Sequence, residues 1–77
     1  MKVFRTRSIE VEGLGQAIKE ARLRDQRPLT KICLLVDMTT ANWYRIEAEK
    51  NESLPEDTLR KIEAILGVDF GVQFEDN

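Results

Sequence analysis

The sequence contains no histidine and only one cysteine, Cys33, among its 77 residues. A single cysteine cannot form an internal disulfide, and a zinc site of the usual ligand types is close to excluded. The absence of histidine also excludes the common His-based acid–base and triad mechanisms. Gly13 and Gly15 are wrongly spaced for a phosphate-binding loop. We therefore expect a protein that is not an enzyme and that uses neither a metal nor a cofactor.

Long hydrophobic runs are also missing. The longest apolar run covers residues 32–36, far short of the roughly 20 residues that a membrane helix needs. Charged residues, Arg5, Arg7, Glu10 and Glu12, interrupt the N-terminal stretch, which therefore does not have the pattern of a signal peptide. We expect a cytoplasmic protein with no membrane partner.

The composition, 42% hydrophobic and 34% charged, is typical of a globular protein, and the length predicts one domain. The net charge of −2 is unevenly distributed. Residues 1–50 hold ten Lys or Arg and seven Asp or Glu, whereas residues 51–77 hold two and seven. An acidic chain is a weak candidate for nucleic-acid binding, but binding uses one face, and the first half is basic.

Apolar residues recur at helical spacing in four segments, which predicts helices over residues 14–24, 29–36, 40–50 and 55–66. Leu29, Ile32, Cys33 and Val36 illustrate the pattern, because they form one stripe along the second helix.

Residues at the ends of these segments have capping chemistry. Thr39 is a credible N-cap, and Gly67 is a natural C-terminal stop. Ser53 and Glu56 have the spacing of a capping box, with Pro55 at the first position of the fourth helix.

The two ends of the chain have strand character. Residues 1–12 are rich in β-branched types and predict a strand or an extended arm. In residues 68–77, four apolar side chains alternate with polar ones, namely Val68, Phe70, Val72 and Phe74. A lone strand needs a partner, so we expect the tail to pair antiparallel with residues 2–11, within one subunit or across a dimer. The helical core is then residues 13–67.

Two short helices joined by a tight turn at residues 37–39 follow the helix-turn-helix plan. The stretches LGQAIKEAR, LTKICLLVDMTTANWYRIE and LPEDTLRKIEAILGV resemble the XRE family of Cro/cI phage-repressor-like proteins over residues 14–68. The resemblance implies a mainly α, four-helix lambda-repressor-like helix-turn-helix domain. It also implies a transcriptional regulator that binds double-stranded DNA as a homodimer.

The resemblance further implies that the start and outer face of the third helix contact bases. These residues are Thr40, Ala41, Asn42, Tyr44 and Arg45. Arg45 could pair with a guanine and Asn42 with an adenine. We expect further DNA contacts from Lys31, Lys50 and Arg27. The alternative for the outer face of this helix is an ordinary solvated surface.

Arg22 and Glu47 each fall on the inward side of their predicted helix, where charges are rare unless paired. We expect a buried ion pair, in agreement with the family; the alternative is that one of them borders the core and extends outward. Trp43 and Cys33 fall on the same inward faces, and we expect both to be core residues.

Several positions depart from the family pattern. Asp37 stands at a turn position that usually holds glycine, although Asp tolerates a left-handed conformation. Leu29 replaces a common phosphate-contacting glutamine. The loop after the third helix is acidic, with Glu49, Glu52, Glu56 and Asp57. These departures keep open a second function, that of an antitoxin-like or adaptor-like protein-interaction module without DNA binding.

Overall fold

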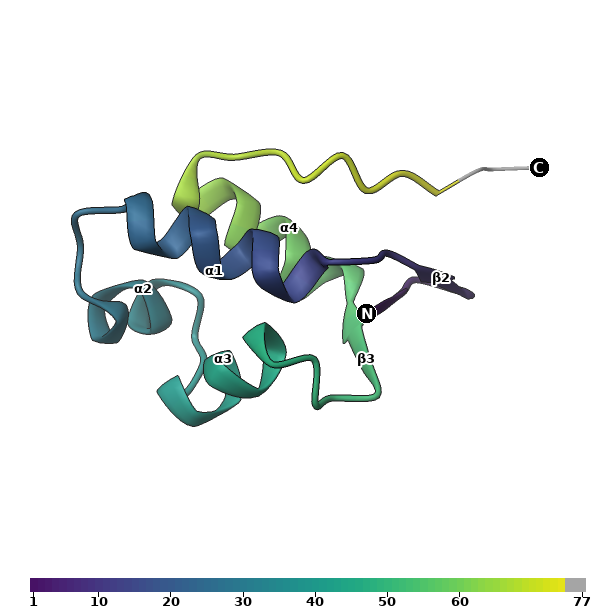
Figure 1. Cartoon of the computed structure of the whole chain (residues 1–77), viewed down its shortest axis with the longest axis horizontal. Helices are drawn as coiled ribbons and strands as arrows, with labels where there is room; N and C mark the ends of the chain where they lie inside the picture. Colours follow the sequence, from purple (N-terminus) through teal and green to yellow (C-terminus); the bar gives the residue numbers. More distant parts are fainter. Residues whose placement is uncertain (75–77) are drawn as a thin grey trace.

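The computed structural model describes residues 1–74, which form four helices and a small three-stranded sheet (Figure 1). The strands are β1 (Lys2–Phe4), β2 (Ser8–Glu10) and β3 (Ser53–Pro55), and the helices are α1 (Leu14–Arg24), α2 (Leu29–Leu35), α3 (Thr40–Glu47) and α4 (Glu56–Leu66). Within residues 1–74, no helix is long and apolar enough to cross a membrane.

The four expected helices are present, with α3 ending three residues early. Glu49 takes a positive φ of 54°, which a continuing helix does not allow, and the helix closes at Ala48. Two capping predictions are confirmed: the hydroxyl oxygen of Thr39 accepts a hydrogen bond from the backbone N–H of Asn42 at 3.1 Å, and Gly67 ends α4 with φ 66°. Asp37 has the left-handed conformation expected of it, with φ 58°.

The predicted capping box at α4 is wrong. Ser53 belongs to strand β3, and Pro55 occupies the N-cap position without a side-chain hydrogen bond. Glu56 is used differently, because its carboxylate binds the guanidinium groups of Arg5 at 2.7 Å and of Arg60 at 3.1 Å. Sequence spacing alone does not reveal that a strand takes up the residues before this helix.

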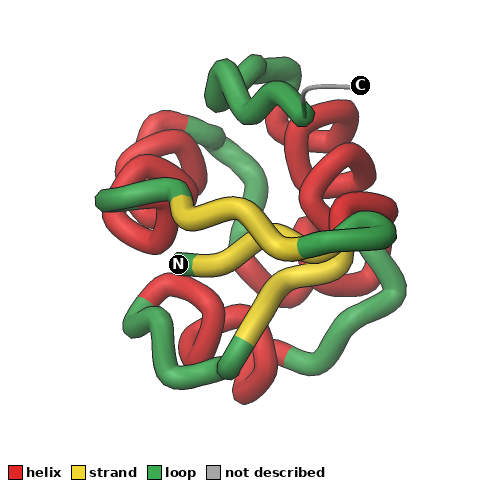
Figure 2. The backbone as a smooth tube through the Cα atoms, turned by 90° about the vertical axis from the view of Figure 1, so that its right-hand side faces the viewer, coloured by secondary structure: helices red, strands yellow, loops and turns green. Residues whose placement is uncertain are grey.

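The N-terminal residues form strands, as expected, but their partners differ from the prediction. Strand β1 lies in the centre of the sheet, antiparallel to β2 and parallel to β3. Val3 faces Ile9 in one ladder and Leu54 in the other, and both Val3 and Leu54 are buried. Figure 2, viewed from the sheet end, shows the three strands lying across one end of the helical core.

The expected C-terminal strand is absent from the part of the tail that the structure describes, residues 68–74. Strand β1 already has a partner on each side, and residues 68–74 do not pair with the outer edge of β2. A turn bends the tail where Asp69 accepts a hydrogen bond from the N–H of Gly71, which has φ 73°. The predicted residues 75–77 of this strand lie outside the described part. The alternation of apolar and polar residues nevertheless predicted correctly that Val72 is buried, since it is 5% exposed.

The tail packs along α4 through side-chain contacts instead of a strand ladder. Arg60 donates to the carbonyl of Val72 at 2.7 Å, and the carboxylate of Glu63 accepts from the N–H of Phe70 at 2.9 Å. Arg60 and Glu63 also bind each other at 2.8 Å. The side chains of α4 therefore satisfy backbone groups that a neighbouring strand would otherwise have to satisfy.

A single core joins the sheet to the helices. Its fully buried side chains come from every helix and from β1 and β3, and include Val3, Leu14, Ile18, Ile32, Trp43, Ile46, Leu54, Leu59 and Ile62. Trp43 and Cys33 are both buried, as the sequence predicted. Because Trp43 and Ile46 point into this core, the orientation of α3 is set by packing on its inner face.

Candidate nucleic-acid interface

The inner face of α3 is joined to α1 by a network centred on Glu47. Its carboxylate accepts from Arg22 Nε at 2.6 Å and Nη2 at 3.0 Å, and from Trp43 Nε1 at 2.5 Å. The side chains of Arg22 and Glu47 are 15% and 6% exposed. The bond to Glu47 raises the pKa of Arg22, which keeps its charge at any physiological pH. The structure thus brings together the two residues that the sequence analysis paired.

Gly15 lets α1 and α3 approach each other closely. A Cβ atom at this position would collide with the backbone carbonyl oxygens of Ile46 and Glu47, at the end of α3. The N–H of Gly15 also donates to the carboxylate of Glu49 at 3.1 Å. The sequence analysis missed this role. The sequence did contain a signal for this close approach: Gly15 lies in the first turn of a predicted helix, where glycine lowers helix stability and so needs another reason to be present.

The outer face of α3 presents three of the five residues expected to contact bases. Ala41, Tyr44 and Arg45 are exposed, and Tyr44 keeps 54% of its surface in solvent. The guanidinium carbon of Arg22 lies 5.7 Å from the centre of the Tyr44 ring, which gives that ring a neighbour on one face. Within residues 1–74, the side chain of Arg45 has no hydrogen bond or ion pair. It can therefore meet a ligand without breaking a contact.

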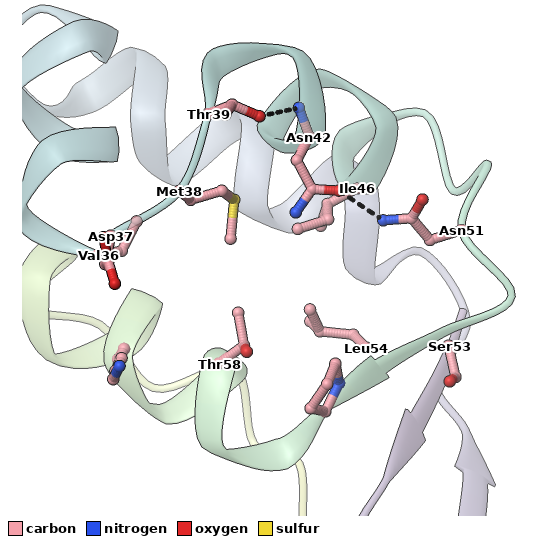
Figure 3. A pocket seen from close by; sticks show the side chains of 12 residues that line it. Val36, Asp37, Met38, Thr39, Asn42, Ile46, Asn51, Ser53, Leu54 and Thr58 are labelled. Carbon is pink, nitrogen blue, oxygen red and sulfur yellow. Dashed lines mark hydrogen bonds between the residues drawn. The ribbon is translucent and has the colours of Figure 1, made fainter.

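Asn42 and Thr40 are placed differently from this group. Both are half-buried, and Asn42 Oδ1 accepts a hydrogen bond from Asn51 Nδ2 at 3.2 Å (Figure 3). Asn42 precedes Arg45 by three residues and the buried Ile46 by four, so it lies at the border between the exposed and the buried side of α3. The structure therefore does not group Asn42 with the exposed residues, and its predicted pairing with adenine would require the side chain to turn.

The three basic residues expected to add DNA contacts fall into two groups. Lys31 on α2 and Lys50 after α3 are exposed. Arg27 is already used within the protein: it binds Asp25 at 2.8 Å and donates to the carbonyl of Ile65 near the end of α4 at 2.5 Å. This end of α4 lies at the opposite side of the molecule from α3 (Figure 1). The guanidinium of Arg27 is therefore held by contacts within the protein, unlike the side chains of Lys31 and Lys50.

Two of the acidic residues expected to repel phosphate have local partners. The amino group of Met1 binds the carboxylate of Glu49 at 2.7 Å, and this contact lowers the pKa of Glu49. Glu56 is bound by Arg5 and Arg60, and the bond to Arg5 helps to lower its pKa to about 2. Their charges are therefore partly compensated. Glu52 and Asp57 remain exposed acidic residues.

Cys33, the one cysteine of the sequence, is buried. Burial raises the pKa of the Cys33 thiol, so little thiolate forms at neutral pH. Among residues 1–74, no three His, Cys, Asp or Glu side chains are placed to hold a metal ion.

Comparison with known proteins finds no match: no protein-family model, curated protein or solved structure is detectably similar to this chain.

Proposed function

We propose that this protein is a sequence-specific regulator that binds double-stranded DNA with α3 in the major groove. The observation that carries the proposal is the division of α3 into two faces. Its inner face is fixed by Trp43, Ile46 and the bond between Glu47 and Arg22, whereas its outer face exposes Ala41, Tyr44 and Arg45. A rigid helix with exposed polar groups suits base readout, because contacts in the groove require precise placement.

The chemistry of the outer face supports the same proposal. Arg45 can donate two hydrogen bonds to the O6 and N7 acceptors of a guanine, and the methyl group of Ala41 can contact a thymine methyl. Lys31 and Lys50 are exposed on the segments next to α3 and can contact phosphates. The resemblance of residues 14–68 to the XRE family agrees with this proposal, but no protein-family model matches the chain. We further propose a homodimer on a palindromic site, which would double these contacts.

A protein-interaction module is the second candidate. It is favoured by exposed leucines on α1 and α2: Leu23 is 63% exposed, Leu34 74% and Leu35 44%. The acidic second half of the chain adds to this, because phosphate contacts supply much of the affinity of DNA-binding proteins. An antitoxin-like or adaptor-like protein would use such exposed apolar side chains to bind a partner.

Selection of bound duplexes from random DNA separates these candidates. We expect a recurrent site whose affinity falls steeply with salt. Arg45→Ala should weaken binding to that site by about 1–3 kcal/mol and relax the preference at one base pair. Lys2→Ala removes an equal charge from the exposed side of β1 and serves as the control, with binding expected to change little. No enrichment, or an Arg45→Ala protein with unchanged affinity and preference, would contradict the proposal.

A further inference from the structure

A trough lies behind the outer face of α3, between α3, the loop that follows it and α4. It has a volume of about 470 Å³, within the range of small-molecule sites, whereas three other hollows measure 240, 250 and 330 Å³. Figure 3 shows Met38, Asn42 and Ile46 on one side of it and Leu54 and Thr58 on the other. The trough thus combines an apolar wall with polar groups.

Two opposite charges line this trough without neutralising each other. Asp37 comes from the turn between α2 and α3, and Lys61 lies one helical turn after Thr58 on α4. Both side chains are exposed, and neither forms an ion pair within residues 1–74. The carboxylate of Asp37 would repel a simple anion, and the ammonium of Lys61 would repel a simple cation. A molecule that carries both charges can satisfy both residues.

The remaining groups favour a ligand with a short apolar chain. Ile46 and Leu54 form the almost fully buried floor of the trough, and Met38, which is half-buried, and Pro55, which is exposed, give it apolar surface that a ligand can reach. The bond between Asn42 and Asn51 uses one oxygen and one nitrogen, which leaves the amide nitrogen of Asn42 and the amide oxygen of Asn51 available. These amide groups can add hydrogen bonds to a ligand whose charged groups are bound by Asp37 and Lys61.

We infer that the trough binds a small zwitterion, an α-amino acid with an apolar side chain, with its ammonium at Asp37 and its carboxylate at Lys61. Such a ligand would contact Asn42 on α3 and the turn that contains Thr39, the N-cap of that helix. If the proposed function is correct, binding of this ligand and of DNA would be linked, so each would change the affinity of the other by the same factor. Only this linkage rests on the proposed function.

Titration of the ¹⁵N-labelled protein with L-leucine tests the inference. We expect saturable shifts of the side-chain amide signals of Asn42 and Asn51. Two comparison compounds keep the chain but lose one charge: 4-methylpentanoate has no ammonium, and 3-methylbutylamine has no carboxylate. We expect each to bind at least tenfold more weakly than L-leucine.

Asp37→Asn and Lys61→Gln should each weaken L-leucine binding at least tenfold, and Asn tolerates the positive φ at position 37. Lys19→Gln, which changes an exposed lysine of α1 outside the trough, is the control and should leave binding unchanged. Shifts that do not saturate, or equal binding by the comparison compounds or the trough variants, would overturn the inference. A protein that binds L-leucine but no duplex would contradict the proposed function alone, and the reverse result would contradict this inference alone.

Discussion

Breaking the ion pair between Arg22 and Glu47 should strongly destabilise the fold. Glu47→Gln removes the charge that faces Arg22, whose side chain is only 15% exposed, so the guanidinium is left nearly buried without its counter-ion. Loss of one partner from a buried pair costs about 3–5 kcal/mol, and the partial exposure of Arg22 places the expected loss near the lower end, about 3 kcal/mol. A domain of this size has a total stability of roughly 4–12 kcal/mol, so the loss is a large fraction.

The loss corresponds to a decrease in melting temperature of roughly 12–24 °C. The fluorescence of Trp43, the only tryptophan and a fully buried one, reports unfolding in urea or on heating. Arg22→Met should cost a similar amount. The double variant should lose about 2 kcal/mol less than the sum of the two single variants, because it leaves no unpaired charge.

Glu20→Gln, which removes an exposed charge from the same helix as Arg22, is the control and should change stability by no more than about 0.5 kcal/mol. Small losses that simply add in the double variant would refute the reasoning, because they would mean that Arg22 and Glu47 do not stabilise each other.

Four further predictions follow from single contacts. Gly15→Ala should lower the melting temperature markedly, because the new Cβ collides with the carbonyl oxygen of Glu47, and calorimetry would measure it. Thr39→Ala should cost about 1 kcal/mol in urea denaturation, the usual value of an N-cap. The pKa of the Asp25 carboxyl is lowered to about 2 by Arg27, so the stability it contributes should be complete above its ordinary value of 3.8 and be lost as pH falls toward 2 in an acid titration. Deleting residues 69–77 should lower the melting temperature, because Val72 and its neighbours cover α4.

Helical periodicity correctly predicted the four helices, because each of them buries one face in the core. Trp43 and Ile46 mark the inner side of α3 in the sequence, and the structure buries both. Alternation in the tail predicted a strand and was wrong about its backbone. Val72 is buried as the alternation indicates, yet its carbonyl binds Arg60 on α4. A pattern of apolar residues reports which side chains are buried, but it does not report what satisfies the backbone.

The part of the site that sequence reasoning missed depends on contacts between distant residues. Arg27 has the charge of a DNA-contacting residue. Its guanidinium, however, already binds the carboxylate of Asp25 and the carbonyl of Ile65, which lies 38 positions away in the sequence. Asn42 lies next to the reading face along the chain, and its bond to Asn51 holds it at the side of the helix. Such local competition for a side chain becomes visible only when the neighbouring elements are in place.

An NMR titration of the ¹⁵N-labelled protein with its selected DNA duplex tests the central claim most directly. The account predicts that the largest shifts occur at Ala41, Tyr44 and Arg45, with smaller shifts at Lys31 and Lys50. It also predicts that raising the salt concentration weakens all of these shifts. Shifts confined to the tail and α4, or no shifts at low salt, would contradict the claim that α3 binds DNA.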